Sequence, residues 1–228
     1  MENIITGKNI SRCFPTGEGE DFYALKGVDI EIPKGKLTIL KGRSGSGKTT
    51  LLNILSALDD ATTGEIYLDG ENISKLSNHE KEILRRKDIG FVFQSVALIP
   101  IMNAYENVDF ALRLADIKED HPDRISTVLK LVDMEERMLH MPGQMSGGEQ
   151  QRIAIARAVA HSPKIIFADE PTGALDTDTG LKVMKLFKNL VEQEGITIVM
   201  TTHDPNLMEM GDVVYEMEDG EIVGRSYK

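Results

Sequence analysis

The sequence Gly42-Arg43-Ser44-Gly45-Ser46-Gly47-Lys48-Thr49 decides the fold of this chain. A glycine, four residues and then Gly-Lys-Thr is the spacing of a phosphate-binding P-loop, in which glycines let the backbone curl closely around a polyphosphate. The backbone amides of such a loop form a cradle for an anion, the lysine reaches the β- and γ-phosphates, and the threonine hydroxyl can ligate Mg²⁺. The stretch therefore predicts a nucleotide site made by these residues and the next one, Thr50. Lys48 is the expected phosphate-binding cation and Thr49 an expected metal ligand.

The residues on either side of this loop fit a strand–loop–helix unit. Residues 37–40 predict a short buried strand, and one apolar face of a following helix is predicted by Leu51, Leu52, Leu55 and Leu58. That helix would begin at the loop, so that its positive end faces the phosphates. The motif alone leaves open a kinase, a GTPase, a motor and a transport ATPase.

The composition narrows the class of protein. A chain of 228 residues is long enough for one large domain, and its formal net charge of −11 argues against nucleic-acid binding, which needs clustered Lys and Arg. The single cysteine, Cys13, cannot form an internal disulfide, which favours a reducing compartment. The first residues do not resemble a signal peptide, and no apolar stretch approaches the roughly 18 residues of a membrane span. We therefore expect a soluble, cytoplasmic chain that is not inserted in a membrane and reaches one only through a partner.

Apolar runs alternate with helical patterns along most of the chain, which predicts an α/β fold with a mainly parallel sheet. Short strands that we expect to pair in an antiparallel subdomain lie at residues 3–14, 23–32 and 65–68. The other predicted strands lie at 89–93, 165–168 and 196–200, with a terminal pair near 213–217 and 221–223. Residues 78–87 are charged and predict a solvated helix. The whole chain, 1–228, is interpreted as a single domain, in which a helical subdomain, 95–162, is inserted in a core formed by 1–94 and 163–228.

Two adjacent carboxylates end the predicted strand Ile165-Ile166-Phe167-Ala168-Asp169-Glu170. In open α/β sheets, ligands bind beyond the carboxyl ends of the strands, and two acids there can divide two tasks. Asp169 would hold Mg²⁺, through water, and Glu170 would polarise the water that attacks the γ-phosphate. Because the strand ends here, the usual alternation of side chains need not keep these two apart. The alternative is a strand that simply leaves the sheet at Pro171.

A second glycine-rich stretch, Met145-Ser146-Gly147-Gly148-Glu149, precedes another predicted helix, which runs to about residue 161. Ser-x-x-Glu is a capping box, in which Ser146 and Glu149 satisfy the first backbone N–H groups of the helix. Capping does not require two glycines, however, and Ser146, Gly147 and Gly148 also form a close-approach surface suited to phosphate. A two-fold dimer, in which this surface of one chain closes on the nucleotide of the other, would give it a role.

This stretch resembles the signature of ATP-binding cassette (ABC) ATPases, usually Leu-Ser-Gly-Gly-Gln, and the resemblance covers essentially the whole chain, with the motifs in family order. It implies a P-loop NTPase fold and ATP hydrolysis with ATP and Mg²⁺. It also implies that Gln94 couples the metal and the attacking water to a transport partner, that His203 contacts the γ-phosphate, and that Asp176 lies at the dimer interface. By themselves, Gln94 is an ordinary strand-end amide and His203 is a loop residue beside a helix start.

The resemblance further implies that Phe14 stacks on adenine, although most such aromatics belong to a core and Tyr23 is a rival. Met145 replaces the usual leucine, and Glu149 replaces the usual glutamine. The glutamate form is similar to the subfamily of lipoprotein release, macrolide efflux, antimicrobial-peptide resistance and cell-division transporters. Arg43 stands where a proline is common, and nothing in the sequence explains it.

The function implied by this resemblance is that of an ABC transporter ATPase subunit. Two copies would sandwich ATP and drive a membrane permease at the inner face of the cell membrane, for export of a lipophilic, peptide or lipoprotein cargo or for mechanical signalling. The apolar stretch 96–102 is either near a docking groove or part of the subdomain core. The alternatives are a non-transport ABC ATPase and a nucleotide kinase or regulator.

Overall fold

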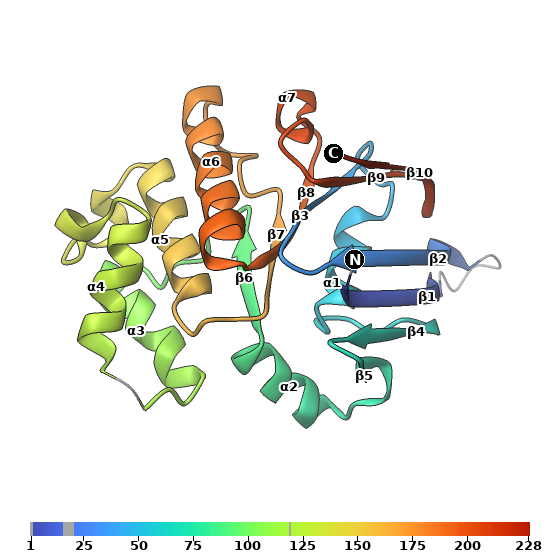
Figure 1. The fold of residues 1–228 in the computed structure, drawn as a ribbon, viewed down its shortest axis with the longest axis horizontal. Coiled ribbons are helices and arrows are strands. Elements are labelled where there is room, and N and C mark those ends of the chain that lie inside the picture. Colours follow the sequence, from blue (N-terminus) through green and yellow to red (C-terminus); the bar gives the residue numbers. More distant parts are fainter. Residues whose placement is uncertain (1, 16–20, 119) are drawn as a thin grey trace.

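The computed structural model describes residues 2–15, 21–118 and 120–228. A six-stranded sheet lies at its centre, with the strand order β10-β9-β3-β8-β7-β6 (Figure 1). Its strands are β3 (Leu37–Lys41), β6 (Ile89–Phe93), β7 (Ile165–Asp169), β8 (Thr197–Thr202), β9 (Val213–Glu218) and β10 (Glu221–Tyr227). All neighbours from β9 to β6 are parallel and only β10 pairs in the antiparallel sense, so the predicted mainly parallel sheet is confirmed.

A second, four-stranded sheet is antiparallel and has the order β2-β1-β4-β5. It consists of β1 (Asn3–Phe14), β2 (Phe22–Pro33), β4 (Thr63–Leu68) and β5 (Glu71–Asn72). Asp69 and Gly70 form the turn between β4 and β5 with positive φ angles of 50° and 84°, as a strong Asp-Gly turn signal predicts. This confirms the expected antiparallel subdomain.

The chain between β6 and β7 consists of helices and turns, and its described residues contain no strand. It holds α3 (Ala104–Leu114), α4 (His121–Leu131) and α5 (Gly147–Val159), with short 3₁₀ turns at Glu135–Arg137 and Pro142–Gln144. We call residues 95–162 the helical block. The remaining helices are α1 (Lys48–Leu55), α2 (Asn78–Lys87), α6 (Thr177–Glu194) and α7 (Pro205–Met208), with a 3₁₀ turn at Ile73–Lys75.

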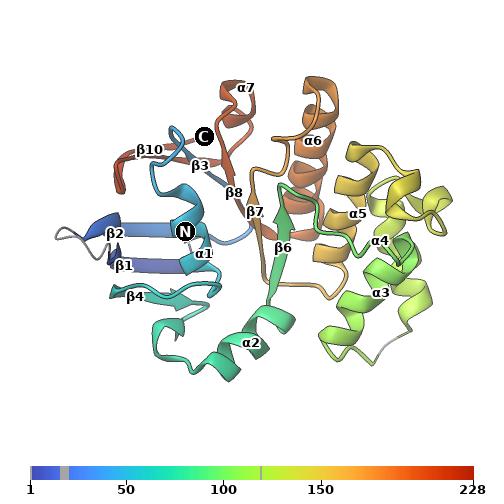
Figure 2. The same cartoon turned by 180° about the vertical axis from the view of Figure 1, so that it is seen from behind.

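Both faces of the central sheet are covered, as Figures 1 and 2 show. On β7, Ile166 and Ala168 belong to a core shared with α3 to α6, whereas Ile165 and Phe167 belong to a core shared with α1 and the antiparallel sheet. A strand buried on both faces needs apolar residues at successive positions, which explains the continuous apolar run before Asp169. A fully buried isoleucine or phenylalanine side chain contributes about 1.5–3 kcal/mol.

The helix that follows the P-loop is shorter than predicted. Leu51, Leu52 and Leu55 are buried as expected, but α1 ends at Leu55 and Leu58 is 43% exposed. The helix ends because Ala57 takes a left-handed φ of 56°, which turns the chain away from the helix axis. The inclusion of Leu58 in the buried face was therefore wrong.

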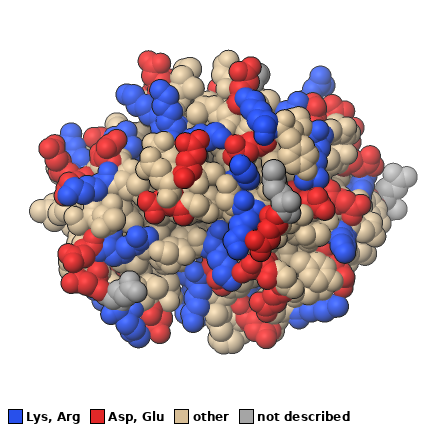
Figure 3. Space-filling view, in the orientation of Figure 1, with Lys and Arg blue, Asp and Glu red and all other residues tan. Residues whose placement is uncertain are grey.

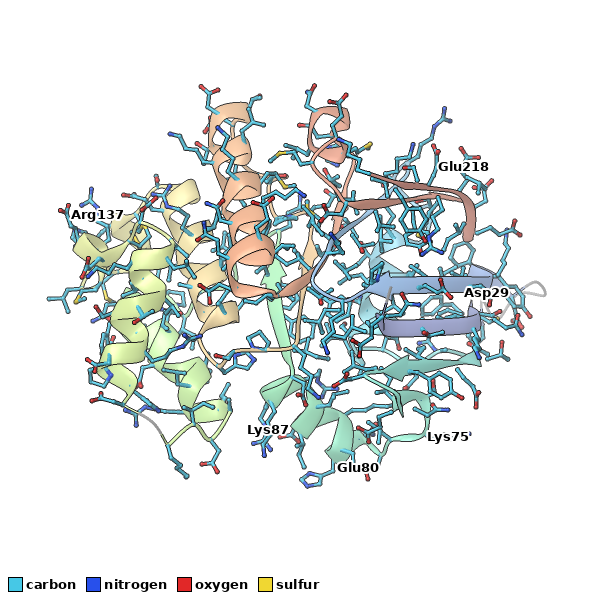
Figure 4. All side chains as sticks on the ribbon, in the orientation of Figure 1. Asp29, Lys75, Glu80, Lys87, Arg137 and Glu218 are labelled. Carbon is cyan, nitrogen blue, oxygen red and sulfur yellow. The ribbon has the colours of Figure 1, made fainter. Side chains whose placement is uncertain are left out.

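Helix α2 begins with a capping box, in which Ser77 and Glu80 each bond the backbone N–H of the other residue. Glu80 and Lys87 point away from the sheets (Figure 4), and only Lys81 and Leu84 of this helix are buried. This confirms the predicted solvated helix. Within the described residues, none of the helices is long and apolar enough to cross a membrane.

Candidate active site

The strand register brings four predicted motifs to one edge of the central sheet. Lys41 of β3 pairs with Thr202 of β8, and Phe93 of β6 pairs with Asp169 of β7. The P-loop, Gln94, Glu170 and His203 each follow one of these paired residues. Residues far apart in the sequence therefore meet beyond the carboxyl ends of parallel strands, where ligands bind in open α/β sheets.

The P-loop closes around the ammonium group of Lys48. Lys48 Nζ donates hydrogen bonds of 2.9 Å to the carbonyl oxygens of Gly42 and Arg43, and the residue is only 6% exposed. An ammonium group has three donors, so one is left for a phosphate. The side chains of Arg43 and Ser44 are exposed at the tip of the loop with Gly45, and nothing in the structure explains the arginine.

Ser46 supports a polar ligand at this loop. Its hydroxyl is buried and has no hydrogen-bond partner among the described residues. A buried hydroxyl without a partner is costly, because it has lost its bonds to water. A phosphate bound in the loop would give the Ser46 hydroxyl a hydrogen-bond partner. Thr50, the last residue of the predicted site, is half-buried in the first turn of α1.

Two glycines of the P-loop are needed for a reason that was not predicted, namely their close contacts with neighbouring strands. Gly47 has a φ of 96°, and a Cβ there would lie 2.6 Å from the carbonyl oxygen of Ala24 in β2. A Cβ at Gly42 would meet the carbonyl of Met217 in β9. These two glycines are therefore required by neighbouring strands of the protein itself, in addition to the predicted close approach of a polyphosphate.

The two carboxylates lie where the sequence places them. Thr49 Oγ1 donates a hydrogen bond of 3.1 Å to Asp169 Oδ1, so the predicted metal ligands from α1 and β7 are in contact. Glu170 has a φ of 43°, which ends the strand alternation and lets both acids reach one edge. The expectation that strand alternation does not separate them agrees with this geometry.

A buried threonine that the sequence analysis missed holds both acids. Thr201 Oγ1 donates 2.6 Å to Asp169 Oδ1 and accepts 2.8 Å from the backbone N–H of Glu170. Thr201 is fully buried in β8. The available signal was a threonine near the end of a buried strand, because a buried hydroxyl needs partners.

Glu170, His203 and Asp176 border a small cavity of about 150 Å³. His203 Nδ1 lies 3.3 Å from Glu170 Oε1, and the imidazole is otherwise exposed. Gln94 reaches the same turn, since a Cβ added at Gly173 would lie 2.8 Å from its Nε2 and 3.4 Å from Glu170 Oε2. The structure thus brings Gln94, Glu170 and His203 together.

The donor set suits Mg²⁺. Thr49 and Asp169 supply hard oxygen ligands in contact with each other, and the described residues hold no cluster of three or more His, Cys, Asp or Glu that would form a protein cage. Mg²⁺ typically takes one or two protein ligands and completes its shell with water and substrate phosphates.

The second glycine-rich stretch lies on the other side of the sheet. Figures 1 and 2 both show α1 to one side of β7 and β8 and α5 to the other. Ser146 Oγ accepts 3.3 Å from the N–H of Glu149, and Glu149 Oε2 accepts 2.8 Å from the N–H of Ser146, so the capping box is confirmed. Hydrogen bonds that the backbone N–H and then the side chain of Ser146 make to the carboxylate lower the pKa of Glu149. Arg137 Nε lies 3.2 Å from Glu149 Oε1, a pairing that the usual glutamine would lack.

The two signature glycines differ in their surroundings. A Cβ at Gly148 would overlap the methyl group of Thr179 in α6, whereas a Cβ at Gly147 would meet only Leu175, at an ordinary 3.6 Å. Thr179 is held in place by Asp176, the N-cap of α6, which accepts 3.0 Å from its N–H and 2.6 Å from its hydroxyl. The same bonds lower the pKa of Asp176. Gly148 therefore has a packing reason that the sequence analysis missed.

We expect Gly148→Ala to destabilise the chain by about 1–3 kcal/mol, because the added methyl group has no room beside Thr179. Thr179→Ser removes the opposing methyl and keeps the hydroxyl bonded to Asp176, so the double variant should recover most of the lost stability. Urea unfolding of the single and double variants measures this coupling. Gly147→Ala is the matched control, and a Gly148→Ala chain as stable as the parent would contradict the contact.

The adenine-stacking residue is still a prediction. Cys13 pairs with Tyr23 and Arg12 with Leu25, next to the Ala24 carbonyl that contacts Gly47, so this hairpin passes beside the P-loop. Phe14 and Tyr23 are both substantially exposed, and the Arg12 guanidinium lies 4.6 Å from the centre of the Phe14 ring. An exposed ring is compatible with stacking and argues against the core alternative.

The comparisons with known proteins agree with this geometry. The family model described as ABC transporter matches residues 25–173. An uncharacterized ABC transporter ATP-binding protein of Methanocaldococcus jannaschii, MJ0796, is 46% identical over 224 residues, which cover 96% of this chain and 95% of the relative. The macrolide export ATP-binding/permease protein MacB of Agrobacterium fabrum is 42% identical over 97% of this chain, which spans 34% of that larger protein.

A solved structure of MJ0796, described as a dimeric post-hydrolysis state bound to ADP and Pi, is 42% identical, covers 98% of both chains and has a TM-score of 0.89. At this level of identity, the similarity shows both the fold and the ATPase class of this chain. The chain therefore belongs to the ABC transporter family, as an ATP-binding and ATP-hydrolysing subunit with the ABC ATPase fold.

Proposed function

We propose that two copies of this chain close around two ATP molecules, each held between the P-loop of one copy and Ser146-Gly147-Gly148 of the other. The observation that carries the proposal is the placement of α1 and α5 on opposite sides of β7 and β8 (Figures 1 and 2). The signature surface is thus set apart from the P-loop of its own chain. The relative MJ0796 has been solved as a dimer, in one structure with ADP and Pi bound, which supports a dimer of this chain.

Within each shared site, catalysis would rest on positioning and charge neutralisation. Lys48 and the loop amides of residues 42–50 bind the phosphates, Glu170 polarises the attacking water, and His203 contacts the γ-phosphate. Thr49, Asp169 and Gln94 would hold Mg²⁺, which supplies further neutralisation of phosphate charge when bound. Asp176 would lie at the dimer interface.

The helical block would dock a membrane permease, which would place the subunit at the inner face of the cell membrane. The stretch 96–102 was expected to lie either near a docking groove or in the subdomain core, and its residues differ in this respect. Leu98 packs against the core, whereas Ile101 is 82% exposed. Leu139 of the same block is 73% exposed. Similarity to MacB, a macrolide export protein, supports export. A lipophilic, peptide or lipoprotein cargo is proposed from the sequence resemblance alone.

A mixing experiment tests the shared site. Lys48→Ala removes the phosphate cation and leaves the signature, whereas Ser146→Arg blocks the signature and leaves the P-loop. Each variant alone should fail to hydrolyse ATP, because both of its composite sites are broken. A mixture contains heterodimers with one intact composite site, so phosphate release should reappear. The readout is phosphate release and trapping of labelled nucleotide as the mixing ratio is varied; a mixture that neither turns over nor traps nucleotide would contradict the shared site.

A further inference from the structure

A large cavity lies away from the nucleotide site. It has a volume of about 680 Å³ and is bordered by Lys34 before β3, Lys164 before β7, and Gly195 before β8. Because these strands are parallel, their amino ends lie at the opposite edge of the sheet from the P-loop and Glu170. The other wall is α4 of the helical block, so the cavity lies where the block meets the two sheets.

The charge of this cavity contrasts with that of the chain. Four cationic side chains line it (Lys34, Arg124, Lys130 and Lys164), against the two acids Asp69 and Glu194, although the chain as a whole carries −11. Figure 3 shows Lys and Arg gathered, among some acids, across the middle of this face, between the helical block and the antiparallel sheet. A local excess of cations in an acidic protein favours an anionic ligand.

Two of these cations have either no acid partner among the described residues or only a distant, exposed one. Arg124 donates only to uncharged oxygens, those of Ala160, Val159 and Ser162, at 2.8 to 3.1 Å, and no ion pair of Arg124 occurs in the part of the chain that is described. The remaining guanidinium nitrogen of Arg124, Nη1, makes none of these hydrogen bonds and can donate to a ligand. Lys34 has its acid partner, Glu2, at 3.8 Å, and both side chains are at least half exposed.

The other two cations have closer acid partners. Lys164 lies 2.9 Å from Asp69 and 3.4 Å from Asp88, so it contributes less to the net charge. Lys130 has Glu135 at 3.5 Å, and its side chain is 67% exposed. A surface pair of this kind is weak and can yield to a ligand.

Most of the remaining lining residues are apolar: Ile4, Val128, Leu131, Val159, Pro163 and Ile196. A volume of this size fits a drug-sized molecule, and pockets for such ligands combine apolar walls with a few placed polar groups. We propose that this cavity binds an organic anion with an apolar aromatic or aliphatic body, at a site separate from the ATP site. The anionic group would face Arg124 and Lys34, and the body would lie on the wall of α4.

The test uses anilinonaphthalene sulfonate, a fluorescent aromatic anion, with the full chain and saturating ADP, so that the P-loop is occupied. The probe should bind with an increase in fluorescence, and phenylnaphthylamine, which has the same rings without the charge, should bind more weakly. Lys34→Ala combined with Lys130→Ala should weaken the sulfonate at least about fivefold. Thr127→Tyr, which fills the cavity from an exposed position of α4, should also abolish binding.

Lys75→Ala is the matched control for charge, since Lys75 lies on the far side of the antiparallel sheet, near α2 (Figure 4). Leu139→Ser controls for binding at exposed apolar side chains of the helical block, and thermal unfolding confirms that each variant is folded. The proposal is overturned if the uncharged analogue binds as tightly as the sulfonate. It is equally overturned if the Lys34→Ala/Lys130→Ala and Thr127→Tyr variants bind the sulfonate as tightly as the parent chain. It is also overturned if only Leu139→Ser loses the signal. None of these outcomes bears on the shared ATP site.

Discussion

The Glu170→Gln variant should bind ATP as tightly as the parent chain but hydrolyse it about 10²-fold more slowly or worse, as expected for the loss of a catalytic base. Glutamine keeps the shape of the side chain and removes its basicity. The backbone N–H bond from Glu170 to Thr201 is independent of the side chain, so the turn at the end of β7 should keep its conformation. Phosphate release measures turnover, and equilibrium binding of ATP measures affinity.

The same variant should accumulate an ATP-bound dimer, because the step that opens the proposed dimer is blocked. Light scattering with and without ATP reports this directly. Glu192→Gln, an equivalent change at an exposed position of α6, is the matched control and should leave turnover unchanged. Turnover of Glu170→Gln within about twofold of the parent would show that another group polarises the water.

The Ser146→Arg variant should lose ATP turnover while its monomer still binds ATP. Ser146 is the N-cap of α5, which lies on the other side of β7 and β8 from α1, so we expect a long cation there to leave the P-loop of its own chain unchanged. It would block closure of a second chain on that surface. Nucleotide binding to the isolated monomer and phosphate release separate the two effects.

Ser146→Arg also removes the N-cap of α5, which costs about 0.5–2 kcal/mol by itself. Ser77→Arg is the matched control, because Ser77 and Glu80 form the same capping box at the start of α2. Both variants should lose similar stability in urea unfolding, and only Ser146→Arg should lose turnover. If ATP affinity of the Ser146→Arg monomer fell as well, the signature would serve the P-loop of its own chain.

Most of the fold could be predicted because the central strands β3, β7 and β8 are buried on both faces. Runs such as residues 165–168 and 89–93 are apolar at every position, and the P-loop joins one such strand to a helix. The long helix α6 was not predicted, although Asp176 as N-cap and Gly195 at the end mark its limits. Its many lysines and glutamates hid the apolar positions, such as Phe187 and Leu190, that face the core.

The motifs of the candidate site were predictable because each is local in the sequence. What could not be predicted are the contacts between motifs, which depend on strand register. Thr201 bonds both Asp169 and the backbone of Glu170, and the pairing of β7 with β8 determines that contact. The packing of Gly148 on Thr179 likewise depends on how α5 and α6 meet. Neither contact can be predicted from the spacing of residues within a motif.

The adjacent glycines at 147 and 148 separate two kinds of constraint on one short stretch. The space beside Gly148 is filled by Thr179 of the same chain, so a side chain there is rejected whether or not a second copy is present. The space beside Gly147 is open to a methyl group in the single chain. If an alanine at 147 impairs the protein, the cause would therefore be a contact with another molecule. Substitutions at this position can test which molecule packs against it.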